Sequence, residues 1–285
     1  MCTNRIVLSS YKIIKRVLAG RGLTKFSFIR GIKNYALEYF KTELVFVQGN
    51  KMYLDKEDCL QLSVNEIIEP VETELFKNKI KNGDIVVDIG ANIVYFTLLM
   101  AKLVGNNGKT FSFEPEPKNF TILSKNVIIN NYKNVVLEKK GVSDYNGTSK
   151  FFLSSENTGM HSLHKVDNKG KEIDIDVIKL DDYFIIEGLV DRISMIKIDV
   201  EGAELQVLNG MTKILKNGKL KLLIEFIPEH LEKHGTNPSD ILKILEDNNF
   251  KLYHINEKTK KLEPKNAENI LENSKLGRNI YCDKE

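Results

Sequence analysis

From residue 66 onward, short apolar strands alternate with segments of helical pattern, and this alternation limits the fold more than any other feature. The best-defined unit is the strand Ile85–Ile89, which is followed by Gly90 and by a helical run over residues 95–103. The same patterns predict further strands at 110–113, 135–139, 149–153, 173–180, 194–200, 220–227, 251–255 and 279–282, and helices at 120–130 and 203–215. Such an alternation is typical of a mostly parallel sheet with helices on both faces. We therefore predict a doubly wound α/β domain over residues 66–285.

Residues 1–65 form a smaller N-terminal appendage with a different composition. Nine basic residues and a single acid, Glu38, lie between Arg5 and Lys41. One interpretation is a basic amphipathic element that makes a peripheral contact with an anionic membrane surface or holds an anionic substrate. The other, which the interspersed glycines favour, is a solvated helix packed on the neighbouring domain. Residues 44–54 predict two short strands around a Gly-Asn turn.

Composition excludes several classes of protein. The chain of 285 residues has 42 basic and 39 acidic side chains, a net charge of +3 that does not favour a nucleic-acid partner. Its three cysteines match no metal or redox spacing, which indicates a reducing, cytoplasmic compartment. No apolar run approaches the roughly 20 residues of a membrane span. No signal-peptide pattern is visible at the start either, so we expect a soluble cytoplasmic protein.

Two groups of polar residues follow the first two strands of the α/β domain, where open parallel sheets bind their ligands. Asp88 to Asn92 lie between a strand and a helix, so that Gly90 allows a tight turn and the helix start offers N–H groups to an anion. Glu114 ends the next strand, at the distance where nucleotide-binding sheets place the acceptor of the ribose hydroxyls. This spacing predicts an adenosine-containing cofactor, with an exposed loop acid as the alternative for Glu114.

A third polar group lies in Ile196-Lys-Ile-Asp-Val-Glu-Gly-Ala-Glu204. Asp199 and Glu201 are carboxylates at one strand end, and such a pair needs a cation, a proton or a hydrogen-bonding ligand. Glu204 begins the next helix, where the helix dipole by itself favours an acid. His230 and His234 are four residues apart, but without the His-Glu-x-x-His pattern we interpret them as a solvated helix face. No metal site is therefore assigned.

With these motifs in order, residues from about 66 to 282 resemble the FkbM family of S-adenosylmethionine-dependent methyltransferases. The resemblance implies a Rossmann-like class I methyltransferase fold, whose seven-stranded sheet has an antiparallel last strand. It also implies S-adenosylmethionine as the cofactor and methylation of hydroxyl oxygens, often on sugars or natural-product scaffolds. The segments that carry the resemblance are Glu69-Pro-Val-Glu72, Gly83–Asn92, Phe113–Pro117, Asn157–Leu163 and Ile196–Glu204.

The resemblance also implies roles for single residues. Glu114 holds the ribose, the turn Gly141–Asp144 lies against adenine, and the loop from His161 to His164 helps to cover the substrate. Asp199 and Glu201 lie near the transferred methyl group and the acceptor hydroxyl. The residues implied to contact the cofactor are Asp88, Gly90, Ala91, Asn92, Glu114, Ser143 and Asp144.

One residue departs from the family pattern. Val94 stands where the family has the second glycine of Gly-Ala-Asn-x-Gly. A β-branched residue at that point is strained if φ is positive, which implies a shifted loop or weaker cofactor binding. The alternative function is therefore a non-catalytic or weakly active cofactor-binding protein. Two other rivals are an NAD-dependent oxidoreductase, which lacks its full G-x-G-x-x-G fingerprint, and a nucleic-acid methyltransferase, which lacks its Asp/Asn-Pro-Pro-Tyr motif.

Methyl transfer to a hydroxyl requires a general base. We assign this role to Asp199 or Glu201, helped by His164. A divalent cation shared by Asp199 and Glu201 is a further option, for which the sequence shows no third ligand. The expected partner is a small-molecule or glycan substrate; the sequence assigns neither the acceptor nor an oligomeric state.

Overall fold

A computed structural model describes residues 43–55, 58, 60–62, 65, 67–154, 161–163, 170–273 and 279–284. The chain divides into two compact units, Met1–Ile68 and Glu69–Glu285, which are described separately. The basic segment of residues 5–41 lies outside the described residues, so its role stays a prediction. Within the described ranges, no helix is both long and apolar enough to cross a membrane.

In the first unit, β1 (Leu44–Val47) and β2 (Asn50–Tyr53) form an antiparallel hairpin. Its two turn residues, Gln48 and Gly49, have φ values of 50° and 82°. Positive φ at both positions is the type I′ geometry that matches the twist of a two-residue hairpin. The predicted hairpin is confirmed. The predicted Gly-Asn turn is wrong by one residue, because Asn50 already pairs with Val47 in the ladder.

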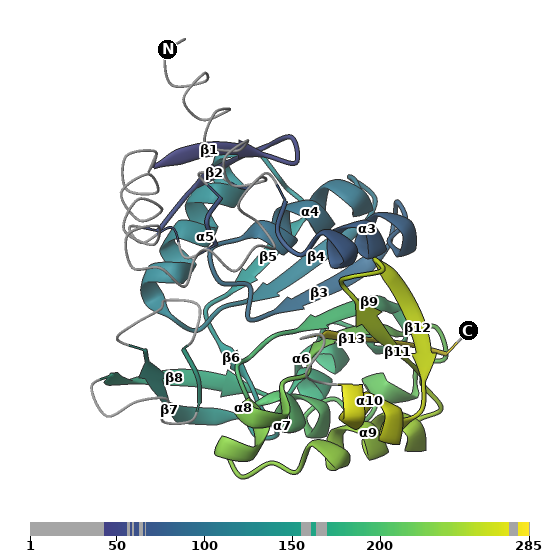
Figure 1. The fold of residues 1–285 in the computed structure, drawn as a ribbon. Coiled ribbons are helices and arrows are strands. Elements are labelled where there is room, and N and C mark those ends of the chain that lie inside the picture. The colour runs from purple at the N-terminus through teal and green to yellow at the C-terminus, as the bar shows by residue number, and fades with distance from the viewer. Residues whose placement is uncertain are drawn as a thin grey trace, which may run out of the picture. The chain divides into compact units, whose positions relative to one another are not determined.

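The second unit contains an eight-stranded sheet in the order β12-β11-β13-β10-β9-β3-β4-β5 (Figure 1). The five strands from β10 to β5 are parallel to one another, whereas β13 is antiparallel to both of its neighbours. In spatial order, the strands are β12 (Lys261–Lys265), β11 (Lys251–Asn256), β13 (Asn279–Asp283), β10 (Lys221–Glu225), β9 (Ile193–Ile198), β3 (Ile85–Ile89), β4 (Lys109–Phe113) and β5 (Val135–Glu138).

The predicted parallel sheet with an antiparallel last strand is confirmed, but the predicted number of seven strands is wrong. The additional strand is β12, which pairs with β11 as an edge hairpin. Its sequence, Lys-Leu-Glu-Pro-Lys, has charges and a proline in place of the apolar residues that mark a buried strand. Charges and proline are typical of edge strands, because they hinder pairing with another chain.

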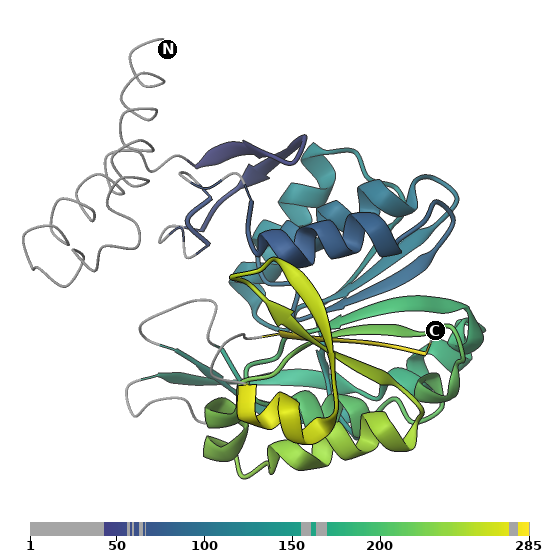
Figure 2. The same ribbon diagram turned by 45° about the vertical axis from the view of Figure 1, so that its right-hand side comes forward.

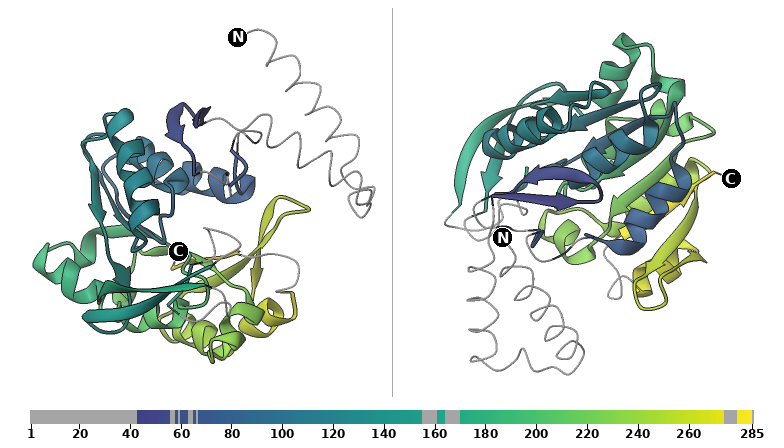
Figure 3. Two further views of the ribbon diagram at one scale, coloured as in Figure 1. Left: turned by 90° about the vertical axis from the view of Figure 1, so that its left-hand side faces the viewer. Right: turned by 90° about the horizontal axis from the view of Figure 1, so that it is seen from above.

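Helices cover both faces of this sheet (Figures 2 and 3). The strand β3 explains why, since all five of its residues are buried and its side chains alternate between the two faces. Ile85, Val87 and Ile89 pack in one core with residues of α6, α7, α9 and α10. One layer contains α3 (Pro70–Lys79), α4 (Tyr95–Val104) and α5 (Pro117–Ile129), and the other contains α6 (Leu180–Ile186), α7 (Glu204–Asn209), α8 (Pro228–Lys233), α9 (Pro238–Asp247) and α10 (Ala267–Asn273).

Two local features complete the unit. The strands β6 (Gly141–Val142), β8 (Lys171–Ile178) and β7 (Gly147–Leu153) form a separate three-stranded sheet, which includes the extra strands predicted at 149–153 and 173–180. The helix predicted over 203–215 is wrong in its second half, because α7 ends at Asn209. At the next residue, Gly210, the chain passes so close to Ser143 that a Cβ would lie 2.0 Å from the Ser143 backbone oxygen. Beyond it, the Asp181 carboxylate accepts hydrogen bonds from the backbone N–H groups of Lys213 and Ile214.

Candidate active site

A buried polar network supports the loop that follows β3. The Oδ2 atom of Asp88 accepts a hydrogen bond from Thr97 Oγ1 at 2.6 Å, and Thr97 Oγ1 also lies 3.0 Å from Ser112 Oγ. Burial raises the pKa of Asp88, although the charge of Lys197 and the Thr97 hydrogen bond act against this shift. The other oxygen, Asp88 Oδ1, is buried and has no hydrogen-bond partner among the described residues. Such an atom fits a ligand that brings N–H or O–H donors.

Gly90 brings this loop against the end of β9. Its φ is 78°, and a Cβ at this position would lie only 1.8 Å from the backbone oxygen of Asp199. The structure therefore requires glycine here for the approach of a neighbouring strand end, whether or not a ligand is also close. Gly90 and Ala91 both donate their N–H groups to the carbonyl of Phe113, so these donors are already engaged.

Glu114 is the acidic side chain that this loop holds. The carboxylate of the buried Glu114 accepts hydrogen bonds from the backbone N–H groups of Asn92 and Glu116, each at 2.8 Å. Burial raises the pKa of Glu114 to about 8, although these two hydrogen bonds lower it. The alternative of an exposed loop acid is wrong. Each oxygen of a carboxylate has a second lone pair, so Glu114 retains the capacity to accept two hydroxyls of a diol.

Val94 has the positive φ that would make a β-branched residue strained. Its φ is 120° and its ψ is −9°, at the position just before α4, and its side chain is fully buried. Asn126 of α5 donates a hydrogen bond to the carbonyl of Ile93 at 3.0 Å, which helps to hold the preceding residue. A valine in this region costs of order 1–3 kcal/mol in backbone strain.

The residues predicted to lie against adenine follow β5 and β6. Ser143 is buried and donates its backbone N–H to the carbonyl of Ile178, and its hydroxyl lies 3.3 Å from Asp144 Oδ1. Asp144 is exposed. The contact of Ser143 and Asp144 with the cofactor stays a prediction.

A buried lysine lies at the end of β9 and interacts with the carboxylates of Asp88 and Asp199. Lys197 Nζ contacts Asp199 Oδ2 at 2.7 Å and lies 5.1 Å from the centre of the Phe96 ring. Burial opposes the charged form of Lys197, but Asp199 and Asp88 together outweigh it and raise the pKa of the ammonium. Lys197 had no predicted role, because the sequence pattern does not show which partner a charged residue inside an apolar strand contacts.

The segment Glu69–Glu72 also had no predicted role beyond the resemblance. In the structure, Asn279 of β13 donates hydrogen bonds to Glu72 Oε1 at 3.1 Å and to Glu69 Oε2 at 3.3 Å. Burial raises the pKa of Glu72, whereas the Asn279 hydrogen bond lowers it. This contact ties the start of α3 to the last strand of the sheet.

The turn that follows Asp199 has an unusual backbone. Glu201 has a φ of 52° and Gly202 a φ of 101°, and a Cβ on Gly202 would lie 2.1 Å from His234 Cδ2. Glu204 stabilises this turn, because its Oε1 accepts hydrogen bonds from the N–H groups of Val200 and Gly202, each at 3.2 Å. Burial raises the pKa of Glu204 to about 7. Glu204 thus has a structural role at the start of α7.

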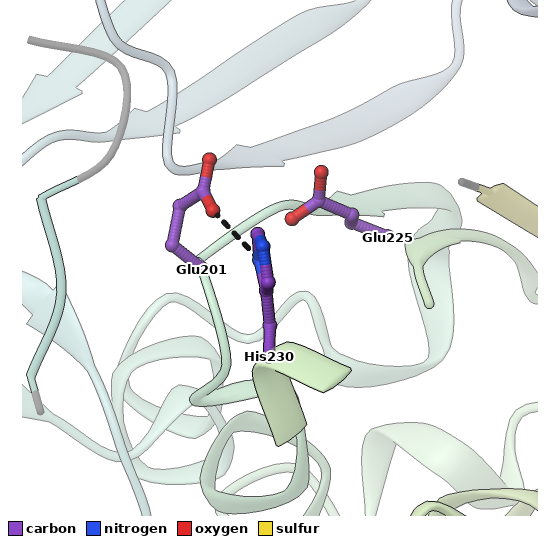
Figure 4. A group of neighbouring side chains, drawn as sticks. All are labelled: Glu201, Glu225 and His230. Atoms are coloured by element: carbon purple, nitrogen blue, oxygen red, sulfur yellow. Dashed lines mark ion pairs between the residues drawn. The ribbon is translucent and has the colours of Figure 1, made fainter. Parts of the chain in front are cut away.

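Glu201 lies close to two residues from other elements (Figure 4). His230 Nδ1 of α8 is 3.2 Å from Glu201 Oε2, and Glu225, the last residue of β10, completes the group. One ligand atom from each residue lies within 4.8 Å of the other two. The interpretation of His230 and His234 as a solvated helix face is therefore wrong. Glu225 was not predicted as a site residue, although an acid at the carboxyl end of a parallel strand is a recognisable signal for one.

The loop predicted to cover the substrate is described only at residues 161–163. Ser162 Oγ donates a hydrogen bond to the backbone oxygen of Glu201 at 2.8 Å, and Ser162 pairs with Phe152 of β7. The described part of the loop therefore lies beside the Glu201 turn. His164 lies outside the described residues, so its catalytic role stays a prediction.

The strand order and the positions of the carboxylates together define the class of protein. An antiparallel last strand, inserted beside five parallel strands, is the sheet of a Rossmann-like class I methyltransferase. The methyltransferase FkbM domain matches residues 88–252, and the chain belongs to this family. S-adenosylmethionine is the methyl donor. The donor fits the residues present, since Asp88 Oδ1 and the Glu114 carboxyl group are buried acceptors of the kind that an ammonium and ribose hydroxyls need; their contact with the donor stays a prediction.

Curated relatives share between a quarter and a third of the aligned residues. The chain is 28% identical over 173 residues to the hexuronic acid methyltransferase AglP of Haloferax volcanii, covering 61% of this chain and 66% of that protein. It is 27% identical over 162 residues to the 31-O-demethyl-FK506 methyltransferase FkbM of Streptomyces tacrolimicus, covering 47% and 61%. The alignments thus span about two thirds of these relatives.

Among solved structures, the methyltransferase FkbM of Methylobacillus flagellatus KT matches with a TM-score of 0.41 and 14% identity. The match covers 80% of this chain and 56% of that one.

Proposed function

We propose that the chain is an O-methyltransferase that methylates a hydroxyl group of a sugar, a glycan or a natural-product-like small molecule. The observation that carries the proposal is the position of Asp199. Its backbone meets Gly90 of the loop after β3, while its side chain, at the carboxyl end of β9, contacts Lys197 and is 30% exposed. A proton acceptor thus lies next to the predicted cofactor loop. The names of two relatives, which act on hexuronic acid and on 31-O-demethyl-FK506, support this substrate class.

In the proposed reaction, the chain aligns the acceptor and removes its proton. When bound, S-adenosylmethionine supplies a methyl group on a sulfonium centre. The chain has to hold the acceptor oxygen in line with this carbon at near-attack distance. As the O–C bond forms and the C–S bond breaks, the hydroxyl proton passes to a general base. Both carboxylates have a partner, Lys197 for Asp199 and His230 for Glu201. Asp199 is favoured for this role because its side chain is the more exposed of the two, at 30% against 14% for Glu201.

The test is a search for the acceptor with product analysis. The full chain is incubated with methyl-labelled S-adenosylmethionine and a panel of free hexuronic acids, uronic-acid glycosides and polyol natural products. We expect label in at least one hydroxyl-bearing acceptor, and a methyl ether in the purified product by NMR. A product methylated at nitrogen or carbon would contradict the proposal.

One observation supports the second candidate, a non-catalytic or weakly active cofactor-binding protein. Val94 has a φ of 120° in the loop where the family has glycine. Calorimetry with S-adenosylmethionine on the wild type and on Val94→Gly separates the two functions. Binding by Val94→Gly alone supports the second candidate, whereas binding by the wild type together with methyl transfer in the acceptor search supports the enzyme.

A further inference from the structure

Three side chains from three separate elements converge at the carboxyl ends of β9 and β10 (Figure 4). We propose that Glu201, Glu225 and His230 bind a divalent cation. The role suggested below for this cation rests on the proposed function, since it would bind the hydroxyl of the methyl acceptor.

The geometry of the three residues suits a single ion. The Nδ1 atom of His230 is 3.2 Å from Glu201 Oε2, and one ligand atom of each residue lies within 4.8 Å of the other two. Ligands at about 2.1 Å from one metal ion lie about 3 to 4 Å apart. Small rotations of side chains are therefore enough to bring all three donors to bonding distance.

The charges of the two carboxylates also favour a cation at this position. The side chains of Glu201 and His230 are only 14% and 22% exposed, and Glu225 is 9% exposed. Two carboxylates this close together in a partly desolvated position repel each other unless a cation or a proton lies between them. A protonated His230 is the rival to a metal ion, and the experiment below separates the two.

The backbone around Glu201 is held in place by other parts of the chain. The close approach of Gly202 to His234 sets the turn against the end of α8, the helix that carries His230. Ser162 also donates its hydroxyl to the backbone oxygen of Glu201. A ligand on a supported turn loses less conformational entropy when it binds a cation.

The donor set indicates the type of ion and what the site can do. Two carboxylates and one imidazole suit Mn²⁺, Fe²⁺ or Zn²⁺ better than an all-oxygen ion such as Ca²⁺. Three protein ligands leave coordination positions open for a substrate. A cation here would bind the acceptor oxygen and lower the pKa of its hydroxyl. The proton would then pass to Asp199, the neighbouring carboxylate.

The test is a direct measurement of Mn²⁺ binding, without any methyl acceptor. The full-length chain is titrated with MnCl₂, and free Mn²⁺ is followed by its electron paramagnetic resonance signal. We expect one saturable site in the wild type. Glu225→Gln and His230→Asn should weaken it by about 100-fold or more, because losing even a partner of a ligand costs 10–100-fold. Glu229→Gln is the matched control, since it removes an exposed carboxylate next to His230 on α8.

Binding of S-adenosylhomocysteine by each variant reports whether it is folded. No saturable Mn²⁺ site in the wild type, or an equal loss in Glu229→Gln, would overturn the proposal and favour the protonated His230. Methyl transfer that continues in excess EDTA would leave the proposed function intact and remove the role of the cation. Mn²⁺ binding as expected, without transfer to any acceptor, would support the site and contradict the proposed function.

Discussion

The two halves of the site differ in how deeply their polar side chains are buried. At the ends of β3 and β4, Asp88 and Glu114 are buried, with Thr97 bound to one oxygen of Asp88 and backbone N–H groups bound to both oxygens of Glu114. At the ends of β9 and β10, the Asp199 side chain is 30% exposed, and the group around Glu201 is more open as well. A buried, hydrogen-bonded half is suited to hold a cofactor of constant shape. The more open, charged half is suited to meet a variable acceptor and exchange protons.

The halves are nevertheless joined at two points. Gly90 of the first half touches the backbone of Asp199 in the second, and Lys197 lies between the carboxylates of Asp88 and Asp199. Changes in one half should therefore leave the other intact only where they avoid these contacts. The predictions below test this division.

The largest effect is expected for Asp199→Asn, which should lower turnover by about 10³-fold, within the usual range for loss of a general base. The reason is that the amide cannot accept the hydroxyl proton, although it keeps a similar shape. Affinity for S-adenosylhomocysteine, measured by calorimetry, should change far less than turnover, because asparagine keeps the backbone contact with Gly90 even though Lys197 loses its charged partner. Full turnover in the variant, or a comparable loss of cofactor affinity, would contradict the assignment of cofactor binding and proton transfer to different halves of the site.

The next effect concerns the stability of the second half. The pKa of Glu204 is about 7 in the folded chain against 4.5 for the free side chain. Because the pKa is higher in the folded chain, Glu204 is protonated in both states below pH 4.5 and does not destabilise the fold there. As the pH rises to about 7, ionisation of Glu204 increasingly destabilises the folded state. Glu204→Gln, which keeps an acceptor for Val200 and Gly202, should therefore be more stable than wild type by up to about 3 kcal/mol above pH 8.

Urea denaturation at low and high pH checks this prediction, with the exposed Glu229→Gln as the control. A difference between Glu204→Gln and wild type that does not depend on pH would contradict the expected protonation of Glu204.

A smaller effect is expected in the first half. Burial raises the pKa of Glu114 to about 8, so the side chain is largely protonated at neutral pH. A carboxylate accepts both ribose hydroxyls, whereas the protonated form has lost acceptor capacity. Affinity for S-adenosylhomocysteine should thus rise with pH, by about 20-fold between pH 6.5 and 8.5. Glu114→Gln removes this titration while other groups still titrate, so an unchanged pH profile in the variant would contradict the assignment.

The smallest effect is expected at Val94. Val94→Ala loses buried methyl groups but keeps a Cβ at a φ of 120°, whereas Val94→Gly also relieves the strained backbone. We expect Val94→Gly to be more stable than Val94→Ala by about 1 kcal/mol in urea denaturation, the reverse of their order inside a helix. If alanine is the more stable of the two, the backbone at Val94 is not strained, and the second candidate function loses its support.

Much of the parallel sheet was predictable because its strands are buried on both faces. The strand Ile85–Ile89 and the start of the following helix at Tyr95 agree with the structure residue by residue. The edge strand β12 was not predictable, since its charged residues and proline resemble the sequence of a loop. The end of α7 was also missed, because it depends on the contact between Gly210 and Ser143, which lie far apart in the sequence.

Local sequence patterns were enough to predict the fold class, the family and the meeting of the Asn92 loop with Glu114. Local signals were enough for this, because a glycine turn and a carboxylate after adjacent parallel strands must lie at one edge of the sheet. Only the tertiary structure showed that Lys197 pairs with Asp199 and that Glu225 and His230 lie beside Glu201. These contacts join different strands and helices, and the spacing between two such residues in the chain carries no information about their distance in space.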